Sequence, residues 1–500
     1  MLNYSVAELR KYKKKVINIK LIFKVLGALL YIETAMMIVC LLASVWYGED
    51  DFVAFAISSV VTMMGALVLR FMGITDTNTL SRKDAYLVVT LSWITFSLFG
   101  TLPFLTSGHV HGFTNAFFEA MSGFTTTGAS IINDVEALPH GLLFFRSLMQ
   151  WIGGLGIVFF TIALLPSMTG GSVRVFAAEA TGPIKSKLHP RLSTSAKWIW
   201  SIYIFLTIAC FMAYWAFGMT GFDALNYGMT TTATGGFSTH NNSTEFFNNP
   251  CIEYSCVFFC FASGVNFVLL WTAVSKHQLG RLFKSVEFKT YAGMIAVSTL
   301  IIIYELMTHN GYSMGHALRS ALFCVVSFVT TTGIYNDDVG LWPHVTWIVL
   351  AACMFMGGMS GSTSGGMKCI RGVMLIKMVR NEFRQLLHPN AVLPVRIDGS
   401  SISQQKNNSL MALLGVYAIL VALGIVLLML MNVDFVNAIN IAITSLSNVG
   451  PTLGVTIGPS MSWDMLPPLA KWICAFYMLL GRLEIFTVLI LFSRAFWREN

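Results

Sequence analysis

Four short stretches have the residue types and spacing that best suit chemistry in this 500-residue chain: Thr125–Ala129, Thr232–Gly236, Thr330–Ile334 and Ser447–Pro451. The first three are rich in threonine and glycine, and the fourth has serine, asparagine and glycine; we call all four Thr/Gly stretches. Their glycines recur about every 100 residues, which is typical of an internal repeat. A bare alkali cation can be held by rings of main-chain carbonyl oxygens that replace its water shell. Glycine lets the backbone turn its carbonyls toward an axis, and threonine adds a hydroxyl group. The stretches therefore predict a site for an alkali cation.

The predicted ligands are the backbone carbonyls around one glycine in each stretch. A single Thr-Gly loop is more commonly an ordinary turn, but four loops at matching positions are not explained in that way. The predicted cation site consists of Thr126, Thr127, Gly128, Ala233, Thr234, Gly235, Thr331, Thr332, Gly333, Asn448, Val449 and Gly450. No other metal site is expected, because His109, His111 and His240 lack the spacing of metal ligands. The nine cysteines form no CxxC pair and read as buried thiols.

The composition shows what kind of fold must position these stretches. Hydrophobic residues make up 55% of the chain, charged residues only 11%, and the mean hydropathy is +0.68. Soluble chains carry about 25% charged residues. This excludes a soluble enzyme and a disordered protein, and the absence of strands that alternate apolar with polar residues excludes an outer-membrane barrel. The predicted fold class is an all-α polytopic membrane protein with ten transmembrane helices and four re-entrant pore helices.

The spans and the short helices can be placed from runs of apolar residues. A span needs about 20 helical residues, and ten runs qualify, at 25–47, 52–73, 85–105, 143–166, 197–218, 254–275, 290–308, 345–367, 409–431 and 468–493. The first run is too long for a signal peptide and no small-residue cleavage site ends it, so we expect it to be a span. Four shorter apolar segments, each followed at once by a Thr/Gly stretch, lie near 113–124, 222–232, 315–330 and 434–446. Apolar segments of this length are candidates for re-entrant helices.

One order of elements, namely span, short segment, Thr/Gly stretch and span, occurs four times. It predicts a two-helix unit at 1–75 followed by four pore repeats around one pore, at 76–185, 186–285, 286–395 and 396–500. Basic residues gather in alternate loops, and the loops on the other side contain a single one, Arg319. The positive-inside rule therefore predicts that both termini and the basic loops are cytoplasmic. Topology thus accounts for the net charge of +8, and no nucleic-acid partner is expected.

Several motifs resemble the TrkH/TrkG family of potassium-uptake proteins, and the resemblance extends over essentially the whole chain. The motifs are Phe118–Gly123 before the first stretch, Thr234–His240, Asn448–Pro451, His388–Ala391, the Gly/Ser run at 357–366 and Gly481–Thr487. The resemblance implies K⁺ as the transported ion, uptake across the bacterial cytoplasmic membrane through a channel-like pore, and no covalent cofactor. Thr452, Ser364 and Ile334 depart from the family pattern, which affects selectivity or gating rather than the class.

The resemblance also implies an assembly. Members of the family form homodimers with one pore in each protomer, and they sit on a cytosolic ring of the TrkA type. Nucleotide would then be bound only by that ring. The basic loops at 169–197, 275–289 and 368–406 are the expected docking surface for the ring.

A glycine-rich run at the end of the eighth apolar run, together with one arginine in the last, predicts a gate. The glycines are Gly357, Gly358, Gly361, Gly365 and Gly366. Each costs a helix about 1 kcal/mol, which favours a broken helix over close helix packing. The resemblance places an intramembrane gate loop at 357–366. Arg482 lies near mid-membrane, where a charge costs at least about 2.5 kcal/mol; we expect it to oppose cation passage, and the alternatives are a structural ion pair or a side chain that snorkels to the interface.

Other interpretations are weighed on single residues. Glu119 is either a site carboxylate or a brace for its pore helix, and the brace is favoured. Na⁺- or H⁺-coupled symport of the Ktr type stays open. An alternating-access carrier is disfavoured, because it needs inverted repeats and acids at mid-membrane, where this chain offers chiefly Glu33 and Glu484. An intramembrane enzyme is disfavoured because the sequence contains no HExxH, GxSxG or acidic metal motif, so no enzymatic activity is expected.

Overall fold

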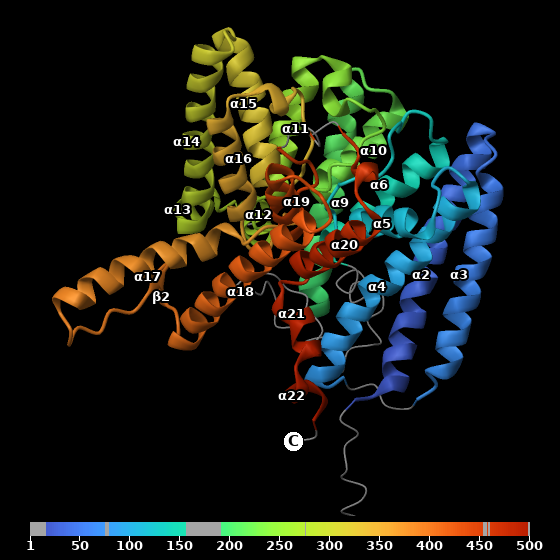
Figure 1. Cartoon of the computed structure of the whole chain (residues 1–500), viewed down its shortest axis with the longest axis horizontal. Helices are drawn as coiled ribbons and strands as arrows, with labels where there is room; N and C mark the ends of the chain where they lie inside the picture. Colours follow the sequence, from blue (N-terminus) through green and yellow to red (C-terminus); the bar gives the residue numbers. More distant parts are fainter. Residues whose placement is uncertain are drawn as a thin grey trace, which may run out of the picture.

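The computed structural model describes residues 17–75, 80–156, 192–275, 277–453, 458 and 461–498. Regular structure in these residues is almost entirely helical. The exception is a hairpin of β1 (Arg396–Ile397) and β2 (Ser400–Ser401), in which Arg396 pairs with Ser401 and Ile397 with Ser400. Figure 1 shows α17 (Cys369–Leu387) and the hairpin projecting from one side of the helical assembly, and the first two helices on the opposite side. The predicted helical class is confirmed.

Six apolar helices in the described part of the chain are long enough to cross a membrane. They are α2 (Ile19–Tyr47), α3 (Phe52–Met72), α4 (Arg82–Ser107), α9 (Leu192–Ala216), α14 (Val286–His309) and α18 (Gln404–Met429). Each coincides with one of the predicted spans. Local chemistry fixes their ends: α4, for example, begins with a capping box, in which Ser81 Oγ accepts from the Asp84 N–H and the Asp84 carboxylate accepts from the Ser81 N–H at 2.8 Å.

Two predicted spans are broken rather than continuous, which corrects the prediction for 254–275 and 468–493. The first consists of α11 (Pro250–Ser263) and α12 (Phe267–Ser275), which meet at 101°. Asn266 starts the second half, because its Oδ1 accepts from the N–H groups of Val268 and Leu269 at 2.9 and 3.3 Å. The second consists of α20 (Pro468–Arg482) and a segment that starts with α21 (Phe486–Leu489) and continues as η5 (Ile490–Phe492), bent by 108°.

The helices of two other predicted spans are shorter than their apolar runs, and the glycine run at 357–366 predicted this break for one of them. α16 (His344–Met356) ends where Gly357 adopts a φ of 67°, so the predicted span at 345–367 is a helix followed by an irregular loop. α6 (His140–Leu155) covers the first part of the predicted span at 143–166, and the residues from 157 onward lie outside the described part. Most of the predicted basic loop at 169–197 lies outside it as well.

Four short helices coincide with the predicted short segments. They are α5 (Phe113–Phe124), α10 (Gly221–Ala233), α15 (Met314–Val329) and α19 (Phe435–Ser447). Polar side chains start three of them, since Thr220, Ser313 and Asp434 accept hydrogen bonds from N–H groups of the first turn. Their C-terminal halves are buried in the interior, so the Thr/Gly stretches that follow them lie inside the molecule.

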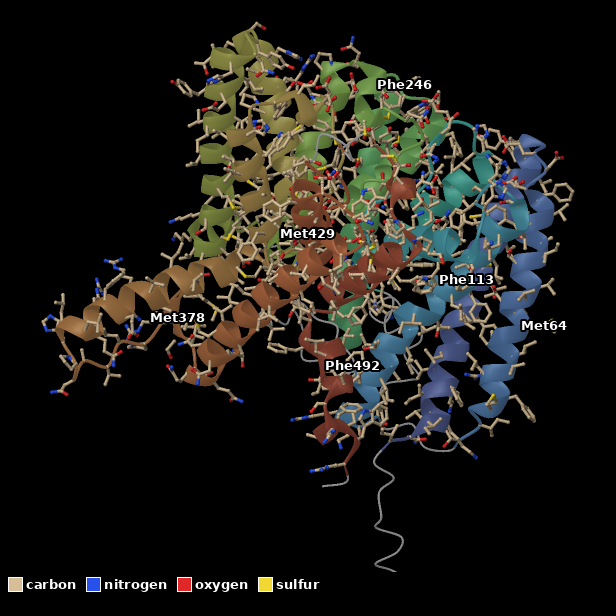
Figure 2. All side chains as sticks on the ribbon, in the orientation of Figure 1. Met64, Phe113, Phe246, Met378, Met429 and Phe492 are labelled. Carbon is tan, nitrogen blue, oxygen red and sulfur yellow. The ribbon has the colours of Figure 1, made fainter. Side chains whose placement is uncertain are left out.

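The other described elements are short or lie at the edges: η2 (Ser243–Phe247), α13 (Leu279–Lys284), η3 (Val339–Leu341), η4 (Trp463–Met465) and α22 (Arg494–Trp497). The largest buried clusters join the α2–α6 region to α18–α20, and α9–α11 to α14–α16. Large apolar side chains also point outward, including Met64, Met429 and Phe492 in Figure 2. Extended apolar surface of this kind suits contact with lipid.

Candidate ion site and gate

The four Thr/Gly stretches meet one another in a closed ring. In each stretch, a Cβ added to one glycine would overlap the carbonyl oxygen of the next stretch. The pairs are Gly128 with Gly235, Gly236 with Thr332, Gly333 with Val449, and Gly450 with Thr127. The first stretch thus contacts the second, the second the third, the third the fourth, and the fourth the first. We call Gly128, Gly236, Gly333 and Gly450 the glycine ring.

The backbone of each stretch follows the same course. The ring glycines have φ between 76° and 95°, and the residues two places before them, Thr126, Thr234, Thr331 and Asn448, have φ between 54° and 57°. The residue just before each glycine donates its N–H to the carbonyl five residues back, at 2.8 to 3.1 Å. Left-handed φ values are uncommon for residues other than glycine. The same two positive φ values in all four stretches therefore show that the stretches share one backbone conformation.

The structure shifts the second stretch by one residue relative to the prediction, which matched the four stretches to one another by sequence. Gly236, at φ 82°, is the counterpart of Gly128, whereas the sequence analysis predicted Gly235, which lacks a positive φ. Accordingly, Thr234 and Gly235 correspond to Thr126 and Thr127, and Ala233 lies one position earlier. Two consecutive glycines make the register ambiguous in sequence, and the hydrogen bond from Gly235 N–H to Thr230 O at 2.9 Å settles it.

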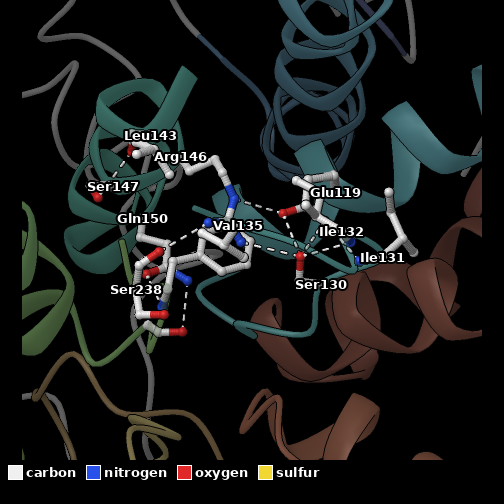
Figure 3. Close-up of polar contacts among 12 residues, drawn as sticks. Glu119, Ser130, Ile131, Ile132, Val135, Leu143, Arg146, Ser147, Gln150 and Ser238 are labelled. Carbon is white, nitrogen blue, oxygen red and sulfur yellow. Dashed lines mark hydrogen bonds and ion pairs between the residues drawn. The ribbon is translucent and has the colours of Figure 1, made fainter. Parts of the chain in front are cut away.

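Behind the ring, a buried ion pair joins the first two stretches (Figure 3). Arg146 on α6 donates from Nε to Glu119 on α5 at 2.9 Å, and both side chains are buried. Glu119 also accepts from the Ile131 N–H at 3.0 Å, just after the first stretch. Arg146 donates to the carbonyl of Ser238 at 3.1 Å, just after the second. Glu119 therefore acts as a brace, and its partner Arg146 was missed, although an arginine inside an apolar run was a usable signal.

Breaking this ion pair should destabilise the protein. Removing one partner of a buried pair costs about 3–5 kcal/mol, because the other charge stays buried without compensation. We therefore expect Arg146→Met alone to lower the melting temperature of the purified protein, and Arg146→Met combined with Glu119→Gln to recover part of the loss. A single variant as stable as the wild type would contradict the assignment of Glu119 as a brace.

The 357–366 loop packs against one side of the ring. Gly365 donates its N–H to Thr331 Oγ1 at 2.6 Å, and Gly366 donates its N–H to the carbonyl of Ser447 at 2.9 Å. Thr363 Oγ1 donates to the carbonyl of Thr232 at 3.2 Å. All three acceptors precede a ring glycine. A cavity of about 80 Å³ on the other side is lined by the four ring glycines and residues that follow them.

The loop is also held from its other side. Ser360 donates its N–H to Glu287 Oε1 at 2.6 Å, and its carbonyl accepts from Asn266 Nδ2 at 2.5 Å. The predicted glycines permit this course: Gly357, Gly361 and Gly366 have φ between 67° and 72°. A side chain at Gly358 or Gly365 would overlap neighbouring atoms. The loop is therefore an ordered plug rather than a loose connection.

Arg482 connects the loop to the ring. Its guanidinium donates to Thr126 Oγ1 at 3.0 Å, to the carbonyl of Thr363 at 3.1 Å and to the carbonyl of Gly154 at 2.7 Å. These contacts put a positive charge at the first stretch, on the side where the loop lies. The sequence analysis predicted that the loop and Arg482 act together, and the structure places them in contact.

On the opposite side of the ring, His240 lines the cavity, and its ring nitrogens lie close to two carboxylates. Its Nδ1 lies 3.3 Å from Glu136 Oε1 and its Nε2 lies 3.5 Å from Asp223 Oδ1. Burial of the imidazole lowers its pKa, but the hydrogen bonds and charges of Asp223 and Glu136 outweigh that effect. The pKa of His240 is therefore raised above its usual 6.5.

This cluster predicts a pH-dependent stability. Because the pKa of His240 is raised in the folded protein, its contribution is complete below the ordinary value and disappears as the pH rises through the raised pKa. We expect His240→Gln to lower the melting temperature at mildly acid pH and to have a smaller effect at alkaline pH. An equal difference at every pH would contradict a charged imidazole between the two carboxylates.

The fold and the site together define a multi-pass helical membrane protein with four inward loops that meet in one ring, and the 357–366 loop packs against one side of that ring. The profile of the TrkH family, described as "Cation transport protein", matches residues 53–499. The Trk system potassium uptake protein TrkH of Halomonas elongata is 37% identical over 484 residues, covering 96% of this chain and 100% of the relative. TrkG of Escherichia coli K12 is 32% identical over 489 residues, with 96% and 99% covered. The chain therefore belongs to the TrkH family, as the sequence resemblance predicted.

A solved structure agrees with this assignment. The crystal structure of the potassium transporter TrkH from Vibrio parahaemolyticus matches with a TM-score of 0.87 at 33% sequence identity, covering 96% of this chain and 99% of that one. The match therefore covers nearly the whole length of both chains.

Proposed function

We propose that this protein takes up K⁺ across the bacterial cytoplasmic membrane through one central pore, with the ring as its selectivity filter. The closed ring carries the proposal, because four converging backbone loops can surround a dehydrated cation with carbonyl oxygens. The names of the relatives, which are Trk system potassium uptake proteins, support K⁺ as the ion.

The filter ligands would come from the two positions before each ring glycine. With the register of the structure, these are Thr126, Thr127, Thr234, Gly235, Thr331, Thr332, Asn448 and Val449. Each of the units at 76–185, 186–285, 286–395 and 396–500 would contribute one stretch. Four other residues that the sequence predicted for the site would shape the backbone rather than bind the ion directly: Gly128, Ala233, Gly333 and Gly450.

The 357–366 loop and Arg482 would form the gate. The loop makes hydrogen bonds directly at the ring, so it would exclude an ion from that side. The guanidinium adds a charge that repels a cation. Opening would require the loop to leave Thr232, Thr331 and Ser447, and Arg482 to release the loop.

The assembly expected from the family would use the projecting part of the chain. Ile376, Val379, Phe383 and Leu386 on α17 are exposed at a spacing that puts them on one face of the helix. Such a stripe suits a second copy, as in a homodimer. The basic loops at 275–289 and 368–406 would face the cytoplasm, as would both termini, and would dock a TrkA-type ring that supplies nucleotide control.

Transport in a defined gradient tests the proposal. Purified protein in vesicles should accumulate K⁺ when the interior is made negative, without an imposed Na⁺ or pH gradient. Uptake that appears only with a Na⁺ or pH gradient would favour the coupled symporter instead. No K⁺ uptake under any of these gradients, from monodisperse protein, would refute the proposed function.

A further inference from the structure

The second Thr/Gly stretch differs from the other three at one position. The residue before the ring glycine is Thr127, Thr332 or Val449 in three stretches, but Gly235 in the second. The peptide between Gly235 and Gly236 thus has a glycine on both sides. Glycine has the greatest backbone freedom, so this peptide is the one in the ring that rotates most easily.

Gln150 on α6, which is labelled in Figure 3, occupies the space beside this peptide. Its Nε2 donates to the carbonyl of Gly235 at 2.6 Å, and its Oε1 accepts from the N–H of Phe237 at 3.0 Å. Gln150 is fully buried, and a Cβ added to Gly235 would overlap its side-chain amide. The glutamine therefore fills the volume into which a side chain at position 235 would project.

The other stretches lack such a partner. In the parts of the chain that the structure describes, the carbonyls of Thr127, Thr332 and Val449 accept no side-chain hydrogen bond. Each of these residues carries a β-branched side chain, which restricts its own backbone. In the second stretch, Gly235 has no side chain to restrict its backbone, and the side-chain amide of Gln150 is hydrogen-bonded to its carbonyl instead.

We infer that Gln150 is a positioning residue that fixes the Gly235–Gly236 peptide and thereby helps to set the ion selectivity of the ring. The inference rests on the proposed function, because it assumes that the ring is a selectivity filter. It explains why one loop of that filter can have the sequence Thr-Gly-Gly where two others have Thr-Thr-Gly. A primary amide suits this role because it donates and accepts at once, holding the carbonyl on one side of Gly236 and the N–H on the other.

Replacing Gln150 tests the selectivity. We expect Gln150→Ala to lower the ratio of K⁺ to Na⁺ uptake in vesicles about tenfold, the effect of losing one or two buried hydrogen bonds. Gln150→Glu keeps the acceptor for Phe237 but turns an oxygen toward the Gly235 carbonyl, so its ratio should fall at least as far. Ser147→Ala is the matched control, because Ser147 lies one turn earlier on α6 and bonds only to Leu143 of its own helix.

An exchange of side chains tests the complementarity itself. Gly235→Thr alone should lower the melting temperature, because the new side chain overlaps Gln150. Gly235→Thr with Gln150→Ala rebuilds the Thr-Gly sequence of the first and third stretches, and should recover both stability and selectivity.

The outcomes separate the inference from the proposed function. A wild-type protein that takes up K⁺ selectively, with Gln150→Ala equally selective, would overturn the inference alone. A wild-type protein without K⁺ selectivity would refute the filter. The melting temperatures of Gly235→Thr and of its double variant with Gln150→Ala would still test whether Gln150 replaces a side chain at position 235. A double variant no more stable than Gly235→Thr would show that Gln150 does not stand in for a side chain at 235.

Discussion

Replacing Arg482 with alanine is expected to raise the basal K⁺ flux at least tenfold and to reduce its dependence on the cytosolic partner. The guanidinium lies at the first stretch and also binds the plug through Thr363. Two unit charges about 4 Å apart repel by about 4 kcal/mol at an effective dielectric constant of about 20. Removing Arg482 therefore removes both a repulsive charge and a contact that keeps the loop in place. Deleting part of the 357–366 loop should act in the same direction.

Two further variants separate a gate from a purely structural role. Arg482→Lys keeps the charge, so its basal flux should stay closer to the wild-type value than that of Arg482→Ala. Arg494 is an exposed arginine in the same C-terminal part, and Arg494→Ala should leave the flux unchanged. Flux would be measured on purified, monodisperse protein in vesicles. Arg482→Ala with normal, fully partner-dependent flux would contradict the gate, and a poorly folded variant with lower flux would favour the structural role.

Serine at any glycine of the ring should abolish most of the K⁺-over-Na⁺ discrimination, with a loss of tenfold or more. Gly128, Gly236, Gly333 and Gly450 all have positive φ, where a side chain is strained. A Cβ at each would also overlap a carbonyl oxygen of the next stretch. Either the carbonyl or the glycine must move, and both lie in the proposed filter, so the spacing of the ring changes.

Gly221→Ser supplies the matched control for the ring. Gly221 begins the short helix before the second stretch, but it has no positive φ and open space around its Cα. We expect normal selectivity from this variant. The comparison would be made from Na⁺ competition against K⁺ uptake, and ring variants that discriminate as well as Gly221→Ser would remove the filter assignment.

The sequence was informative where local composition decides the structure. The four short helices end within two residues of the predicted positions, because an apolar segment followed by small polar residues and glycine stops a helix in a recognisable way. The end of α16 at Met356 follows from the glycine run in the same manner. Repetition also identified the four stretches, and three of the four predicted glycines belong to the ring.

The remaining features depend on contacts between distant residues. The break between α11 and α12 involves Asn266, whose amide binds the 357–366 loop as well as its own helix, and no local pattern shows this. Likewise, Gln150 and Gly235 meet across 85 residues. The register of the second stretch was missed because Gly235 and Gly236 are equal candidates in sequence, and the choice is made by packing against Gln150 and the third stretch.

The most direct test of a K⁺-selective pore is ion competition in proteoliposomes that contain the purified wild-type protein. Uptake of radioactive Rb⁺, driven by an inside-negative potential, would be measured against increasing external K⁺ or Na⁺. The proposed filter predicts that K⁺ suppresses the uptake at concentrations at least tenfold below those needed for Na⁺, and that the ring variants lose this difference. Equal suppression by K⁺ and Na⁺ in the wild type would contradict it.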